Sequence, residues 1–432
     1  MVLKNDTPIF KKAYNVPYRL REKVLTYLDK LEAEKVISPI KTSEWASPIV
    51  IVMKKNNDIR LVIDCKVSIN KSLIPNTYPL PVAQDLFAGL AGCSVFCALD
   101  LEGAYTQLSL SEKSRKFVVI NTIKGLYTYN RLPQGASSSA SIFQQVMDQV
   151  LHGIENVSCY LNNVLVAGKN LQDCSEKLEI VLSRLLEANI KVNWEKCKFF
   201  VSELPYLGHI LSKDGLLPCP NKIKTVREAK APTNVTELKS FLGLINYYHK
   251  FIPHLSSKLC HLYNLLRNDT EYFWNTNCEK AFKESKASLL NSQILEFYDP
   301  KKQIVIVSDA SGYGLGGVMA HIIDGVEKPV CFTSFSLNTA QKNYPILHLE
   351  ALALVSTIKI FINHKDKDKE IKNSKYTQII NHKWEFLVVR ERMQFLLPDC
   401  SDTCWKCPFM ILTSSTDRLP KWETLTFVHV FP

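Results

Sequence analysis

The sequence of 432 residues has no hydrophobic run long enough to span a membrane, because its longest apolar stretches, such as residues 48–53, are only as long as a strand. The first residues contain no apolar core of a signal peptide. Thirteen cysteines are an odd number and are mostly scattered, which argues against a disulfide scaffold. No internal repeats are visible, and 46% hydrophobic with 22% charged residues excludes a disordered chain. We expect a globular protein of the cytoplasm or nucleus, with reduced thiols and no membrane partner.

Positive charge is concentrated in two parts of the sequence. Residues 1–71 contain 14 lysines and arginines against 8 acidic residues, and residues 213–286 contain 12 against 7. Residues 72–212 lie between them and are nearly neutral, with 11 against 12. Clustered positive charge is typical of proteins that bind the phosphate backbone of nucleic acids, although a net charge of +11 also serves solubility. Composition alone leaves both interpretations open.

Hydrophobic periodicity and turn residues predict a mixture of helices and short strands. We predict helices at residues 20–36, 137–151, 171–188 and 346–361, and strands at residues 49–53, 61–63, 95–100, 117–120, 127–132 and 304–307. A hairpin at residues 157–167 is predicted to have Asn162-Asn163 at its apex, since asparagine tolerates positive φ. A second hairpin, from residue 206, is predicted to turn at residues 213–215.

The pattern becomes helical from residue 232. Asn234 and Glu237 have the spacing of a capping box, which predicts the start of a helix. Residues 287–300 resemble a connector. The glycine-rich residues 312–317 are not followed by Lys-Ser/Thr, so we interpret them as strand-and-turn geometry and not as a phosphate-binding loop.

Four motifs in a fixed order carry the candidate chemistry: RLVIDCK at residues 60–66, ALDLEGAYTQL at 98–108, RLPQGASSSASIFQ at 131–144 and CYLNNVLVAG at 159–168. Asp100 ends a predicted strand at a turn, where its carboxylate could hold a cation. The hairpin apex can approach Asp100 if the two β elements are neighbours. Lys54, Lys55 and Arg60 lie on a basic hairpin suited to a polyphosphate, and Gln134 offers an amide to a ribose or base.

Each of these residues also has a structural interpretation. Lys54 and Lys55 could protect an edge strand, and Arg60 could be a solvated cation at the end of a strand. Tyr105 could be a core aromatic residue and Gln134 a simple turn residue.

The four motifs together resemble the reverse transcriptase of gypsy-type LTR retrotransposons, which are relatives of the retroviral polymerases. The resemblance continues through residues 206–209 (YLGH), similar to that family's primer-gripping hairpin, and through residues 241–248 in its thumb region. A second block is similar to the family's ribonuclease H domain and comprises residues 308–311 (SDAS), 343–344 (NY) and 350–353 (EALA).

The resemblance implies an α+β right-hand polymerase followed by an α/β domain. Fingers and palm are expected at residues 14–212, the thumb and connection at 213–286, and an incomplete ribonuclease H-like domain at 287–383. Residues 384–432 form an unassigned tail.

The family's polymerase holds two Mg²⁺ ions with three carboxylates. Asp100 matches the first of them, and the other two belong to a Tyr-x-Asp-Asp hairpin. This sequence has Tyr160-Leu161-Asn162-Asn163, so neutral amides replace both aspartates at Asn162 and Asn163. The formal charge of the site falls from −3 to −1, and the resemblance therefore implies an impaired polymerase.

The ribonuclease H block has a similar deficit. Asp309 and Glu350 match the first two acidic metal ligands of the family, whereas Asn381 stands where the third is expected, and the fourth has no counterpart. Nuclease activity is therefore doubtful too. All three changes are Asp→Asn, which we interpret as decay or hypermutation of an element copy.

By resemblance, the partners are an RNA/DNA primer–template and dNTP substrates, with Mg²⁺ as cofactor. Arg60, Lys54 and Lys55 would contact the triphosphate, Tyr105 would lie beneath the incoming sugar, and Gln134 would contact the nucleotide. The expected activity is RNA-directed DNA synthesis with removal of the RNA strand. The alternatives are a nucleic-acid-binding remnant without catalysis and a pseudogene product.

Overall fold

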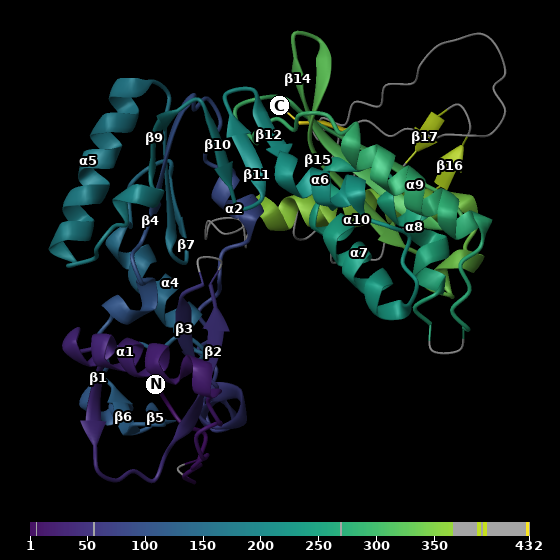
Figure 1. The fold of residues 1–432 in the computed structure, drawn as a ribbon. Helices are drawn as coiled ribbons and strands as arrows, with labels where there is room; N and C mark the ends of the chain where they lie inside the picture. Colours follow the sequence, from purple (N-terminus) through teal and green to yellow (C-terminus); the bar gives the residue numbers. More distant parts are fainter. Residues whose placement is uncertain are drawn as a thin grey trace, which may run out of the picture. The chain divides into compact units, whose positions relative to one another are not determined.

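The computed structural model describes residues 1–365, apart from residues 6, 55–56 and 268–269, together with three short strands between residues 387 and 431 (Figure 1). The described chain forms two compact units. The first comprises Met1–Leu86 and Gly92–Leu204, and the second comprises Phe87–Ala91 and Pro205–Pro432. None of the described helices is long and apolar enough to cross a membrane. The ten cysteines among the described residues are free thiols.

The first unit contains a five-stranded sheet near its N-terminus. Its strands lie in the order β1 (Ile37–Ile40), β6 (Gly125–Tyr129), β5 (Val119–Thr122), β2 (Ser47–Met53) and β3 (Ile59–Ile63). Helix α1 (Tyr18–Ala33) packs on this sheet because Val24 and Leu28 are fully buried one turn apart. The helix α3 (Glu112–Arg115) precedes β5.

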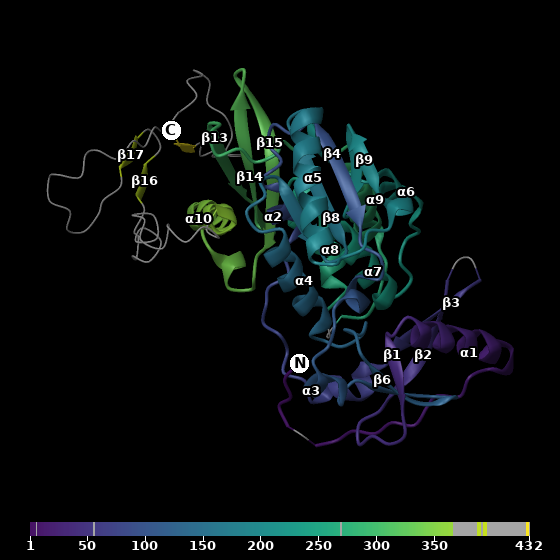
Figure 2. The same cartoon turned by 90° about the vertical axis from the view of Figure 1, so that its left-hand side faces the viewer.

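The second sheet of this unit carries the candidate site. Its order is β7 (Val157–Tyr160), β8 (Asn163–Gly168), β4 (Val95–Asp100) and β9 (Lys198–Val201). Helix α5 (Leu171–Glu187) lies along β4 and β8, with the Asn170 side chain as its N-cap (Figure 2). Helix α4 (Ser139–Val150) contacts β7 and buries Phe143 and Met147 completely. The apolar run of β8 is buried throughout, which is why this strand does not alternate.

The second unit begins around a three-stranded sheet of β10 (Glu203–Tyr206), β11 (His209–Ser212) and β12 (Gly215–Pro218). Four helices follow: α6 (Pro220–Glu228), α7 (Val235–Tyr247), α8 (Leu255–Asn264) and α9 (Thr276–Leu290). Asn234 caps α7 by accepting a 2.9 Å hydrogen bond from the backbone N–H of Glu237. The Glu237 carboxylate accepts a 2.8 Å bond from the backbone N–H of Thr233, so the capping box is confirmed with its return bond displaced by one residue. The short helix α2 (Ala83–Phe87) precedes the segment of this unit at residues 87–91.

A second sheet in this unit has the order β15 (Val326–Ser336), β14 (Gly314–Ile323), β13 (Ile304–Ala310) and β18 (His429–Phe431). Helix α10 (Ile346–Lys365) packs on β13 and β14, while α8 contacts β14 and β15. The glycine-rich residues 312–317 form a turn and the start of β14, as predicted. Strands β16 (Leu387–Val389) and β17 (Arg392–Gln394) form a separate pair.

Most predicted elements are present, with three corrections. The first helix begins at Tyr18 and ends at Ala33, because Lys35 adopts a left-handed φ of 56° and the chain then enters β1. Helix α9 extends to Leu290, so only the rest of the predicted connector is irregular. The second hairpin starts at His209, because a turn at Leu207–Gly208 separates it from β10. Most of the tail at 384–432 lies outside the described residues.

Candidate functional site

Asp100 lies at the carboxyl end of β4, directly opposite Asn163 in the antiparallel ladder with β8. The Asn162 side-chain amide donates a 3.3 Å hydrogen bond to Asp100 Oδ2. Lys196 Nζ lies 3.6 Å from Asp100 Oδ1, and the Asp100 side chain is 21% exposed. The sheet thus brings Asp100, Asn162 and Asn163 together. The second carboxylate oxygen of Asp100, Oδ1, is paired with the lysine.

The apex of the β7–β8 hairpin is Leu161–Asn162, and the prediction of Asn162-Asn163 at the apex is wrong by one residue. Tyr160 and Asn163 pair in the ladder, which leaves a two-residue loop between them. Leu161, and not an asparagine, has the positive φ of 54°. This conformation costs a leucine about 1–2 kcal/mol, so the surrounding contacts must fix it.

Gln144 on α4 provides those contacts. Its side chain is fully buried, and its Oε1 accepts a 2.8 Å hydrogen bond from the backbone N–H of Leu161. Its amide group donates 2.8 Å bonds to the Cys159 carbonyl and to Asp148 Oδ1. Asp148 also accepts a 2.6 Å bond from the Tyr78 hydroxyl, which raises the pKa of Tyr78 to about 12. The hairpin tip is therefore held by a buried polar network.

The donor set at Asp100 does not fit a pair of magnesium ions. Among residues 1–361 as described, no group of three or more His, Cys, Asp or Glu side chains is placed to hold a metal ion. Mg²⁺ gives up its water reluctantly and needs anionic oxygens, whereas Asn162 and Asn163 contribute only neutral amides. Lys196 adds a positive charge at the carboxylate. The site can therefore accept hydrogen bonds, and it can hold a single cation only weakly.

Of the residues predicted to contact a triphosphate, Lys54 directly follows β2 and Arg60 lies on β3. Lys54 forms a 3.0 Å ion pair with Asp58 across the turn between these strands. Arg60 is exposed and lies opposite Val52 in the β2–β3 ladder. Lys55 lies outside the described residues.

Tyr105 lies on the short helix η3 (Ala104–Gln107) and is half-buried. Its ring packs edge-on against Phe143 with centroids 5.5 Å apart, and burial together with the nearby Tyr160 raises its pKa. Tyr105 is therefore close to the hairpin that carries the asparagines while also packing on the core. Gln134 is exposed in the loop before α4.

The second unit holds the other predicted carboxylates, Asp309 on β13 and Glu350 on α10. Glu350 is buried, with 5% exposure, and its Oε2 has no hydrogen-bond partner among the described residues. Burial, and then the charge of Asp309, raise the pKa of Glu350 to about 7. The structure brings these two residues together. A single cation between them would offset both the cost of burying the charge of Glu350 and the repulsion between the two carboxylates. Asn381 lies outside the described residues.

His254, which the sequence did not identify, also lies at this pair. Its Nδ1 is 3.6 Å from Asp309 Oδ2, and its backbone has a left-handed φ of 52° at the start of α8. Asp309 pairs with Gly316 across β13 and β14, and a Cβ at Gly316 would lie 2.6 Å from His254 Nδ1. Glycine at this position is what admits the imidazole. His254 lies 55 positions before Asp309 in the sequence, so no local spacing could reveal the contact.

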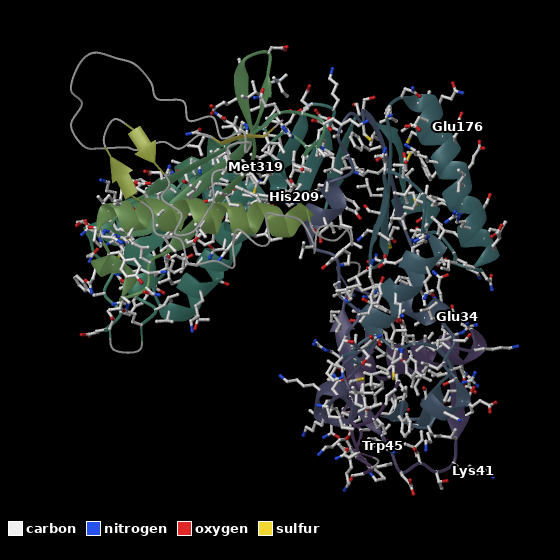
Figure 3. All side chains as sticks on the ribbon, turned by 180° about the vertical axis from the view of Figure 1, so that it is seen from behind. Glu34, Lys41, Trp45, Glu176, His209 and Met319 are labelled. Carbon is white, nitrogen blue, oxygen red and sulfur yellow. The ribbon has the colours of Figure 1, made fainter. Side chains whose placement is uncertain are left out.

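The hairpin predicted to grip a primer is fixed by two tyrosines at the C-terminal end of α7, Tyr247 in its last position and Tyr248 at its C-cap. The Tyr247 hydroxyl donates a 2.6 Å bond to the Leu207 carbonyl, and the Tyr248 hydroxyl donates a 2.7 Å bond to the Gly208 carbonyl. His209, which is labelled in Figure 3, follows this turn. It is buried between aromatic rings, and its Nδ1 lies 2.8 Å from the Leu207 carbonyl. Leu207 and Gly208 both have positive φ, so the hydroxyls hold a turn that the backbone would not favour alone.

Two family descriptions match this chain. Residues 52–211 match "Reverse transcriptase (RNA-dependent DNA polymerase)" and residues 274–366 match "RNase H-like domain found in reverse transcriptase". The Pol polyprotein of the Drosophila melanogaster transposon opus is 31% identical over an alignment of 389 residues, which covers 83% of this chain and 39% of that protein. The chain belongs to the retrotransposon Pol polyproteins. The gypsy-type assignment is consistent with these matches.

Further relatives agree with this membership of the Pol family. The Pol polyprotein of the Drosophila melanogaster transposon 412 is 31% identical over 82% of this chain and 29% of its own length. The Schizosaccharomyces pombe transposon Tf2-7 polyprotein is 32% identical over 73% of this chain and 24% of its own length. This Pol chain thus spans about a quarter to two fifths of the curated relatives it matches.

Solved structures confirm the fold of this Pol segment. A foamy viral protease-reverse transcriptase in complex with double-stranded DNA covers 83% of the chain, and 62% of its own, with a TM-score of 0.75 at 20% identity. The same viral protein in complex with an RNA/DNA hybrid covers 96% of the chain, and 57% of its own, with a TM-score of 0.73 at 19% identity. The predicted α+β right-hand polymerase with a ribonuclease H-like domain is therefore confirmed.

Proposed function

We propose that this chain acts on a primer–template of RNA and DNA as the reverse transcriptase and ribonuclease H region of a Pol polyprotein, with impaired polymerase chemistry. The observation that carries the proposal is the geometry at Asp100. Asn163 lies opposite it in the ladder and Asn162 donates a hydrogen bond to it, which supports the assignment of both amides to the aspartate positions of the family's motif.

The expected loss of rate follows from the charge of the site. Two missing carboxylates, at about 3 kcal/mol each, weaken transition-state stabilisation by about 6 kcal/mol, or roughly four decades in rate. Lys196 at Asp100 acts in the same direction, because it competes with a metal ion for the last carboxylate.

In this proposal the remaining predicted residues keep their family roles. Arg60, Lys54 and Lys55 contact the triphosphate of a dNTP, Tyr105 supports its sugar, and Gln134 contacts the nucleotide. The exposure of Arg60 and the position of Tyr105 beside Tyr160 support these roles. Mg²⁺ is the cofactor by family, and the single carboxylate of Asp100 is expected to hold it poorly.

The decisive experiment is primer extension on an RNA template with Mg²⁺ or Mn²⁺. It compares the protein as it stands with the double variant Asn162→Asp, Asn163→Asp. We expect extension to rise by several decades in the double variant and to disappear again when Asp100→Asn is added. Robust extension by the unchanged protein, or no rise after the double substitution, would contradict the proposal of a charge deficit.

The main alternative is a nucleic-acid-binding protein without catalysis. The buried network around Gln144 favours it, because the hydrogen bonds of this side chain fix the hairpin tip to α4. Tight binding of a primer–template with no extension, even after both asparagines are reverted, would support this alternative.

The ribonuclease H-like domain is a separate question. Residual cleavage of an RNA/DNA hybrid through Asp309 and Glu350 would be abolished by Asp309→Asn. We further propose the boundaries 14–212, 213–286 and 287–383 for fingers and palm, thumb and connection, and ribonuclease H-like domain, and a cytoplasmic or nuclear location.

A further inference from the structure

An exposed tryptophan stands next to the candidate polymerase site. Trp194 lies on the short helix η4 (Trp194–Lys196) and is 62% exposed. Its ring stacks on Phe199, with centroids 6.0 Å apart and an angle of 25° between the planes. Phe199 packs against the core of the first unit, so one face of Trp194 is supported and much of its surface is open to solvent. A supported, exposed aromatic ring is suited to stacking.

The segment around Trp194 is basic. Lys191, Lys196 and Lys198 are all exposed, and Glu195 is the single acidic residue between positions 191 and 200. This local excess of positive charge complements a phosphate backbone. Lysines beside an exposed aromatic platform are the combination that single-stranded nucleic acid requires, because each base has a face that can stack.

The position of this segment is fixed relative to Asp100. The backbone N–H of Asn193 donates a 2.8 Å hydrogen bond to the Asp100 carbonyl. Lys198 lies opposite Ala98 in the β9–β4 pairing, two residues before Asp100 on the same strand. Trp194 is therefore anchored at the end of β4 where Asp100, Asn162 and Asn163 meet.

We propose that Trp194, supported by Phe199 and flanked by Lys191, Lys196 and Lys198, stacks on an unpaired base of the nucleic acid that the chain binds. The inference rests on the proposed function, since it adds a single-strand contact to a primer–template site. The occupant is an unpaired nucleotide strand and not a protein, because the charge of the segment matches phosphate.

The test compares two labelled ligands by fluorescence anisotropy: a blunt RNA/DNA duplex and the same duplex with an unpaired overhang of eight nucleotides. Trp194→Leu keeps an apolar side chain over Phe199 but removes the aromatic face. We expect this variant to bind the overhang ligand about 5- to 100-fold more weakly, with binding to the blunt duplex unchanged. Trp194→Phe should restore most of the loss, because a smaller ring still stacks.

Leu171→Ala serves as the control, since Leu171 on α5 is a comparably exposed apolar residue, at 60%, that lies outside both basic segments. It should leave both affinities unchanged. The inference would be overturned if Trp194→Leu and the unchanged protein bound the overhang ligand with equal affinity. It would also be overturned if the variant lost affinity equally for both ligands. In either case the proposed function would stand. Failure of the unchanged protein to bind either ligand would overturn both.

Discussion

At the scale of single residues, the asparagines of the β7–β8 hairpin contact Asp100 without adding negative charge to it. Replacing aspartate by asparagine removes a charge but hardly changes the shape, so Asn162 still bonds to Asp100 and Asn163 still keeps its place in the ladder. The sequence alone could predict that these asparagines stand at motif positions, because the motif around them is local. It could not identify His254 beside Asp309 or Lys196 beside Asp100, since those contacts join residues distant along the chain.

His209 makes stability depend on pH. Burial, and then the charge of Lys250, lower its pKa from 6.5 to about 3. Below pH 6.5 the unfolded chain binds a proton that the folded chain does not, so the free energy of unfolding falls by about 1.4 kcal/mol per pH unit from this group. Between pH 6.5 and pH 5, we expect the free energy of unfolding of the unchanged protein to fall by about 2 kcal/mol more than that of the variant His209→Phe.

Urea unfolding at a series of pH values checks this prediction. Burial lowers the pKa of Lys250 to about 8. The contribution of Lys250 to the free energy of unfolding therefore changes only above neutral pH, outside the acid range in which His209 is tested. Identical pH slopes for the protein and His209→Phe in the acid range would show that His209 is protonated in the folded state.

At the scale of elements, apolar periodicity predicted the helices and strands, while their ends depended on backbone turns. The apex of the β7–β8 hairpin moved by one residue because the pairing of Tyr160 with Asn163 sets the register. The sequence pattern there, two asparagines in a row, favoured the wrong pair of loop residues. The left-handed conformation fell on Leu161, whose anchor on α4 was not visible in the sequence.

Gln144 should therefore be essential to the hairpin, although it is remote from the chemistry. Gln144→Ala leaves the buried Leu161 N–H and Cys159 carbonyl without partners, and we expect it to lower the free energy of unfolding by about 2–4 kcal/mol. Gln145→Ala is the matched control, because this neighbour on α4 is exposed, and it should cost less than about 0.5 kcal/mol. Thermal unfolding of both variants provides the measurement, and similar melting temperatures would rule out the anchoring role.

At the scale of the whole molecule, basic residues concentrate at positions 1–71 and 213–286. If about five phosphates are contacted, primer–template affinity should fall roughly 10²- to 10³-fold between 50 and 200 mM salt. Anisotropy titrations over that range measure the slope. A nearly flat salt dependence would mean that the excess of positive charge serves solubility and not binding.

The five residues Phe87–Ala91 determine how this protein can be divided into fragments. They belong to the second unit although the chain before and after them belongs to the first, so the backbone crosses between the units three times. A protease that cuts at either of the first two crossings leaves the two units covalently joined, whereas a cut at the third releases residues 205–432 from residues 1–204. A fragment ending at residue 204 would retain Phe87 but lose Tyr206 and His209, whose rings pack against it. Separate expression of residues 1–204 and 205–432 would therefore leave the Phe87 ring on the first fragment without these aromatic partners.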